Sequence, residues 1–451
     1  MDLPEFLVSG QRVRLFPVLA DTSREGRTLS IFLACLCAVD EFGKALLASI
    51  GHRLGTRSRL EAFTEVVFKS GPDQKKVRPD GLVIVNTGKR RWSALVEAKI
   101  GKNEITHNQI DLYAQLAKAN GIDAIITLSN QFVALPEHHP VPLPKVLARS
   151  LSLYHWSWMF IVTQASLLID DEEIKDKDQQ YILSEFVRFI RHPSVGVASF
   201  DRMNSAWKDV VAKIQAGGVL ARNSSDVENT VASWHQETID ICLIMSRKLG
   251  REVKVRLSRA RARDPIQRLR DDCDALVQTA RLECVFDVPD AAAPICVVAD
   301  LRTRSVTTAM KVAAPTDRKS TKARINWLSR QLAKSDSKDV YVKAFWPGRA
   351  NATMVSLTDL RSQPELLEAT NKTMTASSFE VLLVRDLGAR FSGTRTFIEG
   401  LEHVVPTFYE QVGQHLRAWV PPAPKLKEET ADDEIIAETT AVPSEQALPI
   451  N

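Results

Sequence analysis

Two apolar segments of the chain each contain an acidic residue, and a short turn joins them. Residues 78–85 (RPDGLVIV) and 92–100 (WSALVEAKI) are apolar enough for strands of a buried sheet. Residues 86–89 (NTGK) supply the Asn and Gly that a tight turn favours. We therefore predict an antiparallel hairpin whose two strands are neighbours in the sheet.

This hairpin brings two carboxylates and one amine together. Asp80 lies on the first strand, and Glu97 and Lys99 lie on the second. Because side chains alternate along a strand, Glu97 and Lys99 share a face whereas Ala98 points away. Charges in strands this apolar are unfavourable unless partners or a metal ion balance them. In the structural alternative, Asp80 caps a turn with Gly81, and Glu97 and Lys99 form a surface pair.

The same residue types suit phosphodiester hydrolysis. Carboxylates such as Asp80 and Glu97 bind Mg²⁺ (or Mn²⁺), which keeps positions open for water and phosphate oxygens. The metal ion acidifies the attacking water and stabilises the charge on the phosphorus oxygens. Lys99 can orient or deprotonate that water and contact the phosphate. The backbone carbonyl of Ala98 is a further candidate ligand.

The flanking elements place the hairpin inside an α/β core. Apolar residues at helical spacing predict one helix over 27–50, and β-rich residues predict a strand over 62–69. An amphipathic helix is expected over 104–119, with Gly121 as its C-cap, and a doubly buried strand over 122–129. The order helix, three strands, helix, strand predicts a mixed sheet with helices packed on it.

At this point the chain resembles the PD-(D/E)xK, or restriction-endonuclease-like, nuclease superfamily. The resemblance rests on RPDG, then EAK, then a helix with Gln109 and Tyr113, which match the QxxxY motif of the RecB-like branch. It covers about residues 27–132 and implies an αβββαβ core. It also implies that Asp80 and Glu97 are metal ligands and that Lys99 is catalytic, with Gln109 and Tyr113 beside the site.

Many members of that superfamily have another acid on or near the first helix. Glu41, within the predicted helix, and Glu65, within the first strand, both qualify. Glu65 is favoured because an acid inside FTEVVF is otherwise difficult to explain on a core strand.

The rest of the chain predicts a second α/β domain and a tail. Strand and helix signals alternate after residue 226, and Gly, Asn and Ser residues before it mark a boundary. We expect a nuclease domain with a helical extension over 1–216, including a helix at 200–215, and a linker over 217–225. A C-terminal α/β domain over 226–420 and an acidic disordered tail over 421–451 follow.

Charge favours an anionic partner, with DNA expected first. The chain has a net charge of +4, although residues 421–451 hold seven acids and two bases, so the other 420 residues carry +9. Residues 247–270 hold ten Lys or Arg and two acids. Within them we expect a nucleic-acid-binding series on a strand and its continuation, with a solvated basic face as the alternative: Lys254, Arg256, Arg259, Arg261 and Arg263.

Together these patterns predict a cytoplasmic, Mg²⁺-dependent deoxyribonuclease. Six cysteines without a C-x-x-C pair suit a reducing compartment, and neither a signal peptide nor a membrane span is expected. Two alternatives remain, namely a catalytically silent nucleic-acid-binding module with the nuclease fold, or a stress or defence interaction protein. Cleavage of both strands of a duplex often requires two active sites, so a homodimer is also open.

Overall fold

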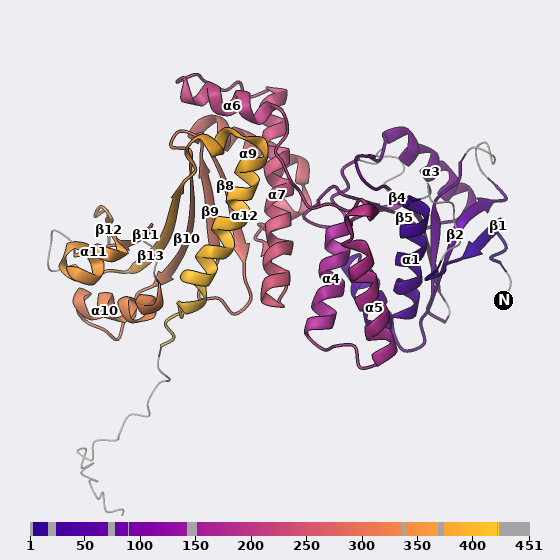
Figure 1. Cartoon of the computed structure of the whole chain (residues 1–451), viewed down its shortest axis with the longest axis horizontal. Coiled ribbons are helices and arrows are strands. Elements are labelled where there is room, and N and C mark those ends of the chain that lie inside the picture. The colour runs from indigo at the N-terminus through magenta and orange to yellow at the C-terminus, as the bar shows by residue number, and fades with distance from the viewer. Residues whose placement is uncertain are drawn as a thin grey trace, which may run out of the picture.

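Two separate β-sheets, one in each half of the chain, organise the molecule (Figure 1). The computed structural model describes residues 3–16, 24–70, 77–88, 90–141, 151–335, 339–368, 374–421 and 423. The expected tail over 421–451 therefore lies outside the described residues, except for positions 421 and 423, as does position 89 of the predicted turn.

The first sheet has six strands that lie side by side in chain order: β1 (Leu7–Arg12), β2 (Arg59–Phe68), β3 (Gly81–Asn86), β4 (Arg91–Ala98), β5 (Ala124–Ser129) and β6 (Ser152–Ser157). Neighbours from β1 to β4 are antiparallel, whereas β4, β5 and β6 run parallel. The sheet is therefore mixed, as the sequence predicted. A parallel pair needs a crossover, and α3 (His107–Asn120) provides it between β4 and β5.

Helices cover both faces of this sheet. The layer on one face consists of α1 (Arg24–Ala38), α2 (Asp40–Ser49), α4 (Trp158–Asp170) and α5 (Lys177–Ile190), followed by the short η1 (Pro193–Val195). Val83 and Val96 belong to the core under these helices, whereas Leu82 and Leu95 pack with α3 on the other face. The alternation along β3 and β4 therefore follows the period of two expected for strands. We call this sheet and its helices the first body.

Two local predictions in the first body were wrong. The helix expected over 27–50 is two helices, because Val39 adopts an extended conformation (φ −109°, ψ 103°) between α1 and α2. Strand β1 was not expected, since its residues, LVSGQR, lack alternation and are mostly exposed. It pairs with β2 at the edge of the sheet, and register shifts mark a bulge in that pairing.

The second sheet is antiparallel throughout. Its seven strands lie in the order β12, β11, β13, β10, β9, β8, β7. They are β7 (Lys254–Val255), β8 (Arg281–Asp287), β9 (Ile295–Asp300), β10 (Ser305–Ala313), β11 (Val340–Phe345), β12 (Thr353–Ser356) and β13 (Ser378–Asp386). Short connections join β8, β9 and β10, which suits antiparallel rather than parallel pairing. The strand expected within residues 247–270 is reduced to the two residues of β7.

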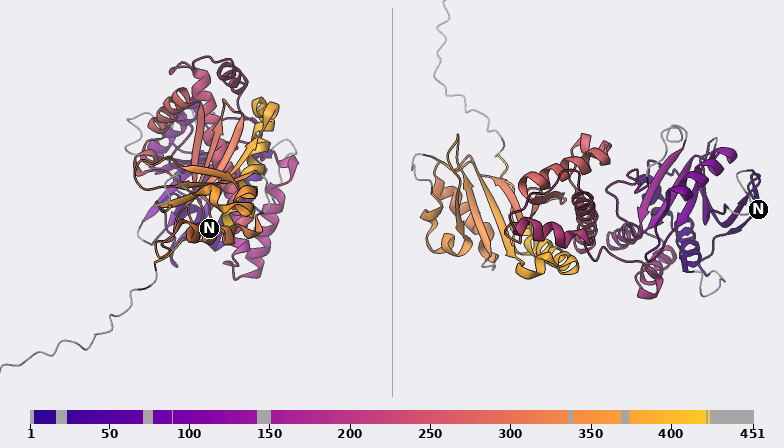
Figure 2. Two further views of the ribbon diagram at one scale, coloured as in Figure 1. Left: turned by 90° about the vertical axis from the view of Figure 1, so that its left-hand side faces the viewer. Right: turned by 90° about the horizontal axis from the view of Figure 1, so that it is seen from above.

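Helices pack against this second sheet to form the second body. They are α6 (Ala206–Gln215), α7 (Ser225–Leu249), α8 (Arg259–Arg263), α9 (Pro265–Thr279), α10 (Thr321–Gln331), α11 (Leu357–Ser362) and α12 (Thr394–Gln411), with the short η2 (Leu332–Lys334), η3 (Pro364–Leu367), η4 (Gly388–Ser392) and η5 (Gly413–His415). Figure 2 shows the two bodies side by side, and α4 contacts α7 between them. At this junction Arg247 Nη1 donates to Thr163 Oγ1 (2.6 Å).

Helix α6 belongs to the second core, although the sequence placed it in the first domain. Trp207 is fully buried, its ring centroid lies 4.4 Å from that of Phe397, and its Nε1 donates to the carbonyl oxygen of Phe391 (2.9 Å). Leu220, in the expected linker, is buried in the same core. The two hydrophobic cores therefore divide the chain before α6 rather than at 217–225. No helix in the described part of the chain is both long and apolar enough to cross a membrane.

Two buried acids on α7 and one half-buried acid on α12 have raised pKa values. Glu237 is 0% exposed, and neither of its carboxyl oxygens has a hydrogen-bond partner. Burial, with the charges of Asp240 and Glu402, raises its pKa well above the usual value. Burial also raises the pKa of Asp240 to about 6 and, with the charge of Asp240, that of Glu402 to about 7.

We predict that these three acids make the free energy of unfolding fall as the pH rises from 5 to 8. Over this window they retain in the native state protons that they have released in the unfolded chain, because their folded pKa values are raised. Glu237→Gln should reduce the fall by on the order of 2 kcal/mol. Urea denaturation at the two pH values measures it, with the exposed Glu228→Gln on α7 as the control. Parallel pH curves for the native protein and Glu237→Gln would contradict the prediction.

Candidate active site

The register of the β3–β4 hairpin sets Asp80 opposite Glu97. Gly81 pairs with Val96 in the antiparallel ladder, so the preceding Asp80 and the following Glu97 are the next pair. The backbone N–H of Ala98 donates to Oδ2 of Asp80 (2.9 Å) and holds that carboxyl against the end of β4. The two acids therefore meet at the end of the hairpin, as the alternation predicted.

Glu97 is the centre of a hydrogen-bond cluster. It is 1% exposed. Its Oε1 accepts from Lys99 Nζ (2.6 Å) and from Gln109 Nε2, and its Oε2 accepts from the Tyr113 hydroxyl (2.6 Å). Gln109 and Tyr113 lie one turn apart on α3, which Thr106 caps by accepting from the backbone N–H of Gln109. The structure thus brings together all five residues on which the resemblance rests.

Negative charge dominates this cluster. Burial and the adjacent charge of Glu97 raise the pKa of Asp80 to about 8, although the Ala98 N–H and Lys99 oppose the shift. Burial lowers the pKa of Lys99, but its hydrogen bond to Glu97 and the charges of Glu97, Asp80 and Glu25 outweigh burial, so the pKa is raised. Burial and Glu97 also raise the pKa of Tyr113. Lys99 is therefore a stable ammonium, and one ammonium faces two carboxyl groups.

The donor set suits a hard divalent cation that keeps several water ligands. Across the described residues, no three His, Cys, Asp or Glu side chains converge as a complete metal site. Mg²⁺ is commonly held by only one or two carboxylates, however, with water and phosphate oxygens completing its shell. Asp80 and Glu97 meet that requirement, and a cation there would take the place of the proton that Asp80 otherwise holds. Ala98, expected to contribute its carbonyl, engages the site through its N–H.

A cavity of about 840 Å³ opens beside Asp80. Its walls come from β1, β2, the start of α1, the segment before β3, and residues 100–103 after β4. Glu25, on the first turn of α1, also lines it, and its Oε1 accepts from Ile100 N–H (3.2 Å) and Asn103 Nδ2 (2.8 Å). Sequence reasoning missed Glu25, because it precedes the apolar repeat from which that helix was predicted.

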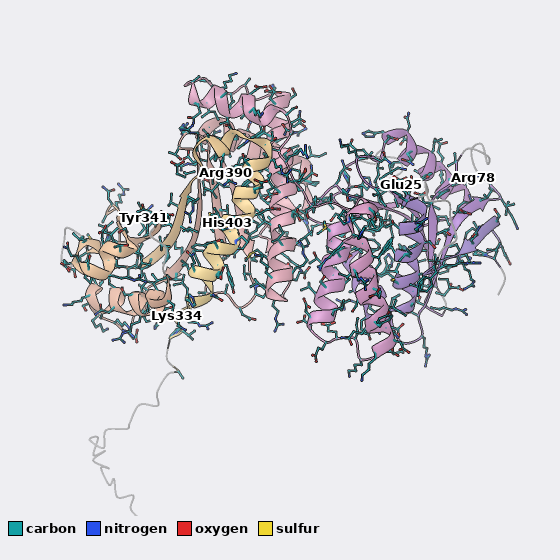
Figure 3. All side chains as sticks on the ribbon, in the orientation of Figure 1. Glu25, Arg78, Lys334, Tyr341, Arg390 and His403 are labelled. Carbon is teal, nitrogen blue, oxygen red and sulfur yellow. The ribbon has the colours of Figure 1, made fainter. Side chains whose placement is uncertain are left out.

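Glu41 and Glu65, the two alternatives for a further acid near the site, lie in different surroundings. Glu65 lines the cavity and accepts from Gln11 Nε2 (2.9 Å). Its φ of +53° places it in the left-handed region at the β1–β2 bulge, which explains how an acid fits within a core strand. Glu41 lies on α2, where its nearest cation is Lys44 (3.9 Å), and it does not line the cavity. Figure 3 labels Glu25 and Arg78 at the same end of the first body.

The basic series expected to bind nucleic acid is largely neutralised. Lys254 pairs with Glu252 (2.8 Å), and Arg256 lies 3.7 Å from Asp287. Arg261 pairs with Asp272. The last three residues of the series, Arg259, Arg261 and Arg263, lie on the short helix α8 rather than continuing a strand. Of this series, Arg259 and Arg263 stay exposed without an ion pair to any described residue.

A second polar cluster continues from Glu97 across the parallel strands. Glu97 pairs with Thr127 in the β4–β5 register, and Thr127 pairs with His155 in the β5–β6 register. Thr127 Oγ1 lies 2.7 Å from Nε2 of His139 and 2.8 Å from Nδ1 of His155. Burial lowers the pKa of His139 to about 4, and burial with the charge of His139 lowers that of His155 to about 3. Both imidazoles are therefore neutral at pH 7 and are joined by one hydroxyl.

Comparisons of the chain with protein families, with curated proteins and with solved structures gave no match. A function can therefore be argued only from the residues and geometry described above.

We predict that Thr127 stabilises the sheet beside the site through its hydroxyl. Thr127→Val should lower the free energy of unfolding by about 2–4 kcal/mol, because two buried imidazole nitrogens lose their partner. Thr127→Ser keeps the hydroxyl and should cost only about 1 kcal/mol for the lost methyl group. Chemical denaturation of both variants tests this, and equal losses would show that the hydroxyl contributes nothing.

Proposed function

We propose that the chain is a Mg²⁺-dependent nuclease that hydrolyses phosphodiester bonds of DNA, with Asp80, Glu97 and Lys99 as its catalytic group. The observation that supports this most strongly is the buried Asp80–Glu97 pair, which faces a single ammonium and of which Asp80 lines the cavity. Two acids held together at this depth are unfavourable without a further positive charge. A divalent cation supplies that charge and is the cofactor of phosphodiester hydrolysis in the proposed class.

The order of elements around the site supports a PD-(D/E)xK core of the RecB-like branch. Helices α1 and α2 precede β2, β3 and β4, and α3 then leads to β5, which gives the αβββαβ order that the resemblance implies. The motif residues lie at matching places, with Asp80 before β3, Glu97 near the end of β4 and Gln109 on α3. Strand β1 and the second body are additions to that core.

Each residue of the site has a role that its contacts suggest. Asp80 and Glu97 would hold Mg²⁺, which, when bound, supplies Lewis-acid stabilisation of phosphate charge and acidifies water. Lys99, whose raised pKa keeps it protonated, would orient the attacking water and donate to a phosphate oxygen rather than remove a proton. Gln109 and Tyr113 are positioning residues, because their side chains hold the Glu97 carboxylate in place.

We predict that Glu97→Gln abolishes metal-dependent cleavage. Losing one of two metal-binding carboxylates removes several kcal/mol of transition-state stabilisation, equivalent to a decrease in rate of about 10²-fold or more. The measurement is cleavage of plasmid and single-stranded DNA in Mg²⁺ and Mn²⁺. Glu41→Gln, the same chemical change on a helix outside the cavity, is the matched control and should cleave like the native protein.

The outcomes separate the proposal from its rivals. Cleavage that is lost in Glu97→Gln and retained in Glu41→Gln supports the site. Equal cleavage by both variants would show that the activity comes from elsewhere. DNA binding without cleavage by the native protein would contradict the nuclease and favour a binding module.

A further inference from the structure

Three arginines from separate segments line the cavity beside Asp80. Arg14 follows β1, Arg24 begins α1, and Arg78 lies two residues before Asp80. All three are exposed. Three acids, Glu25, Glu65 and Asp80, line the same cavity. The cavity therefore has positively charged side chains beside its carboxylates. No function was expected for these arginines from the sequence.

These guanidinium groups have no partner in the part of the chain that the structure describes. Among the described residues, no acidic side chain lies within ion-pair distance of Arg14, Arg24 or Arg78, and their side chains make no hydrogen bond there. The neighbouring Arg12, in contrast, pairs with Glu61 (3.2 Å). Several unpaired cations that converge on one cavity create a local positive potential that attracts an anion.

The backbones that carry the arginines are tied to the catalytic elements. Arg14 exchanges two hydrogen bonds with the buried Ser30 of α1, since its N–H donates to Oγ (3.1 Å) and its carbonyl accepts from the hydroxyl (3.2 Å). The carbonyl oxygen of Arg78 lies 3.2 Å from the hydroxyl of Tyr113, which itself donates to Glu97. The backbones of Arg14 and Arg78 are therefore held against α1 and against the tyrosine that contacts Glu97.

The chemistry of the lining identifies the ligand class. Guanidinium groups bind phosphate oxygens in a two-pronged fashion. None of the described residues that line the cavity is aromatic, so base stacking is not offered there. Contacts to phosphate position a nucleic acid without reading its bases. The lining therefore suits a polynucleotide backbone rather than particular bases.

We infer that Arg14, Arg24 and Arg78 form the subsite that holds the DNA backbone phosphates next to the scissile bond, independently of sequence. This inference rests on the proposed nuclease function and names the part of the site that binds the substrate. It also moves the main DNA contact from the basic series at 254–263 to the first body.

The test compares two triple variants with equal changes in charge. The first is Arg14→Gln/Arg24→Gln/Arg78→Gln. The control replaces Arg259, Arg263 and Arg270 by Gln, which are exposed arginines of the second body without ion pairs among the described residues. Fluorescence anisotropy measures binding to labelled 20-nucleotide single strands and duplexes of two unrelated sequences, in EDTA so that nothing is cut.

We expect the cavity variant to bind at least about 10-fold more weakly than the native protein for both sequences, and its affinity to fall less steeply with salt, by a slope of about 3 for a duplex. The control should bind within about 3-fold of native. A charge-retaining variant, Arg14→Lys/Arg24→Lys/Arg78→Lys, should recover most of the affinity, which excludes misfolding as the cause.

Equal weakening by the two Gln variants, or no DNA binding by the native protein, would overturn the inference. Its failure is distinguishable from failure of the nuclease. If the cavity variant binds and cuts DNA like the native protein, the subsite is wrong and the nuclease stands. If the native protein never cuts but only the cavity variant loses binding, the subsite stands and the nuclease is wrong.

Discussion

Burying the carboxyl groups of Asp80 and Glu97 side by side is unfavourable unless positive charge and hydrogen bonds compensate for it. The first body supplies both from the end of β4 and from α3. Lys99 provides the ammonium, the Ala98 N–H holds Asp80, and Gln109 and Tyr113 saturate Glu97 from α3. What remains is an excess of negative charge that a proton on Asp80 or a bound cation must balance.

The cavity beside Asp80 is lined by segments that are distant in sequence. Gly101 N–H donates to the carbonyl oxygen of Gly196 (3.0 Å), and Asn130 Nδ2 donates to the carbonyl oxygens of both glycines. Gly196 has a φ of +86°, and a Cβ there would lie 2.7 Å from Ile100, so glycine is required at this close approach. Gly196, near the end of the first body, therefore lines the same cavity as β1 and α1.

The sequence predicted those site residues whose contacts follow from their spacing along the chain. Alternation along the strand placed Glu97 and Lys99 on one face, and the resemblance to the nuclease superfamily placed Gln109 and Tyr113 beside the site. Glu25, Arg14 and Arg24 lie in polar segments whose position depends on packing between distant parts of the chain, so no local pattern indicated them. Likewise, the apolar face of α6 predicts a helix but not which core it joins, and apolar strands such as β9 do not specify whether their neighbours are parallel.

We propose that Asp80 and Glu97 together hold a divalent cation. Anomalous diffraction from crystals of the native protein soaked in Mn²⁺ tests it most directly, because it locates the ion without reference to activity. We expect one strong anomalous peak within coordination distance of both carboxylates, and its loss in Glu97→Gln crystals. No peak at this pair, or a peak that persists there unchanged in Glu97→Gln, would contradict it.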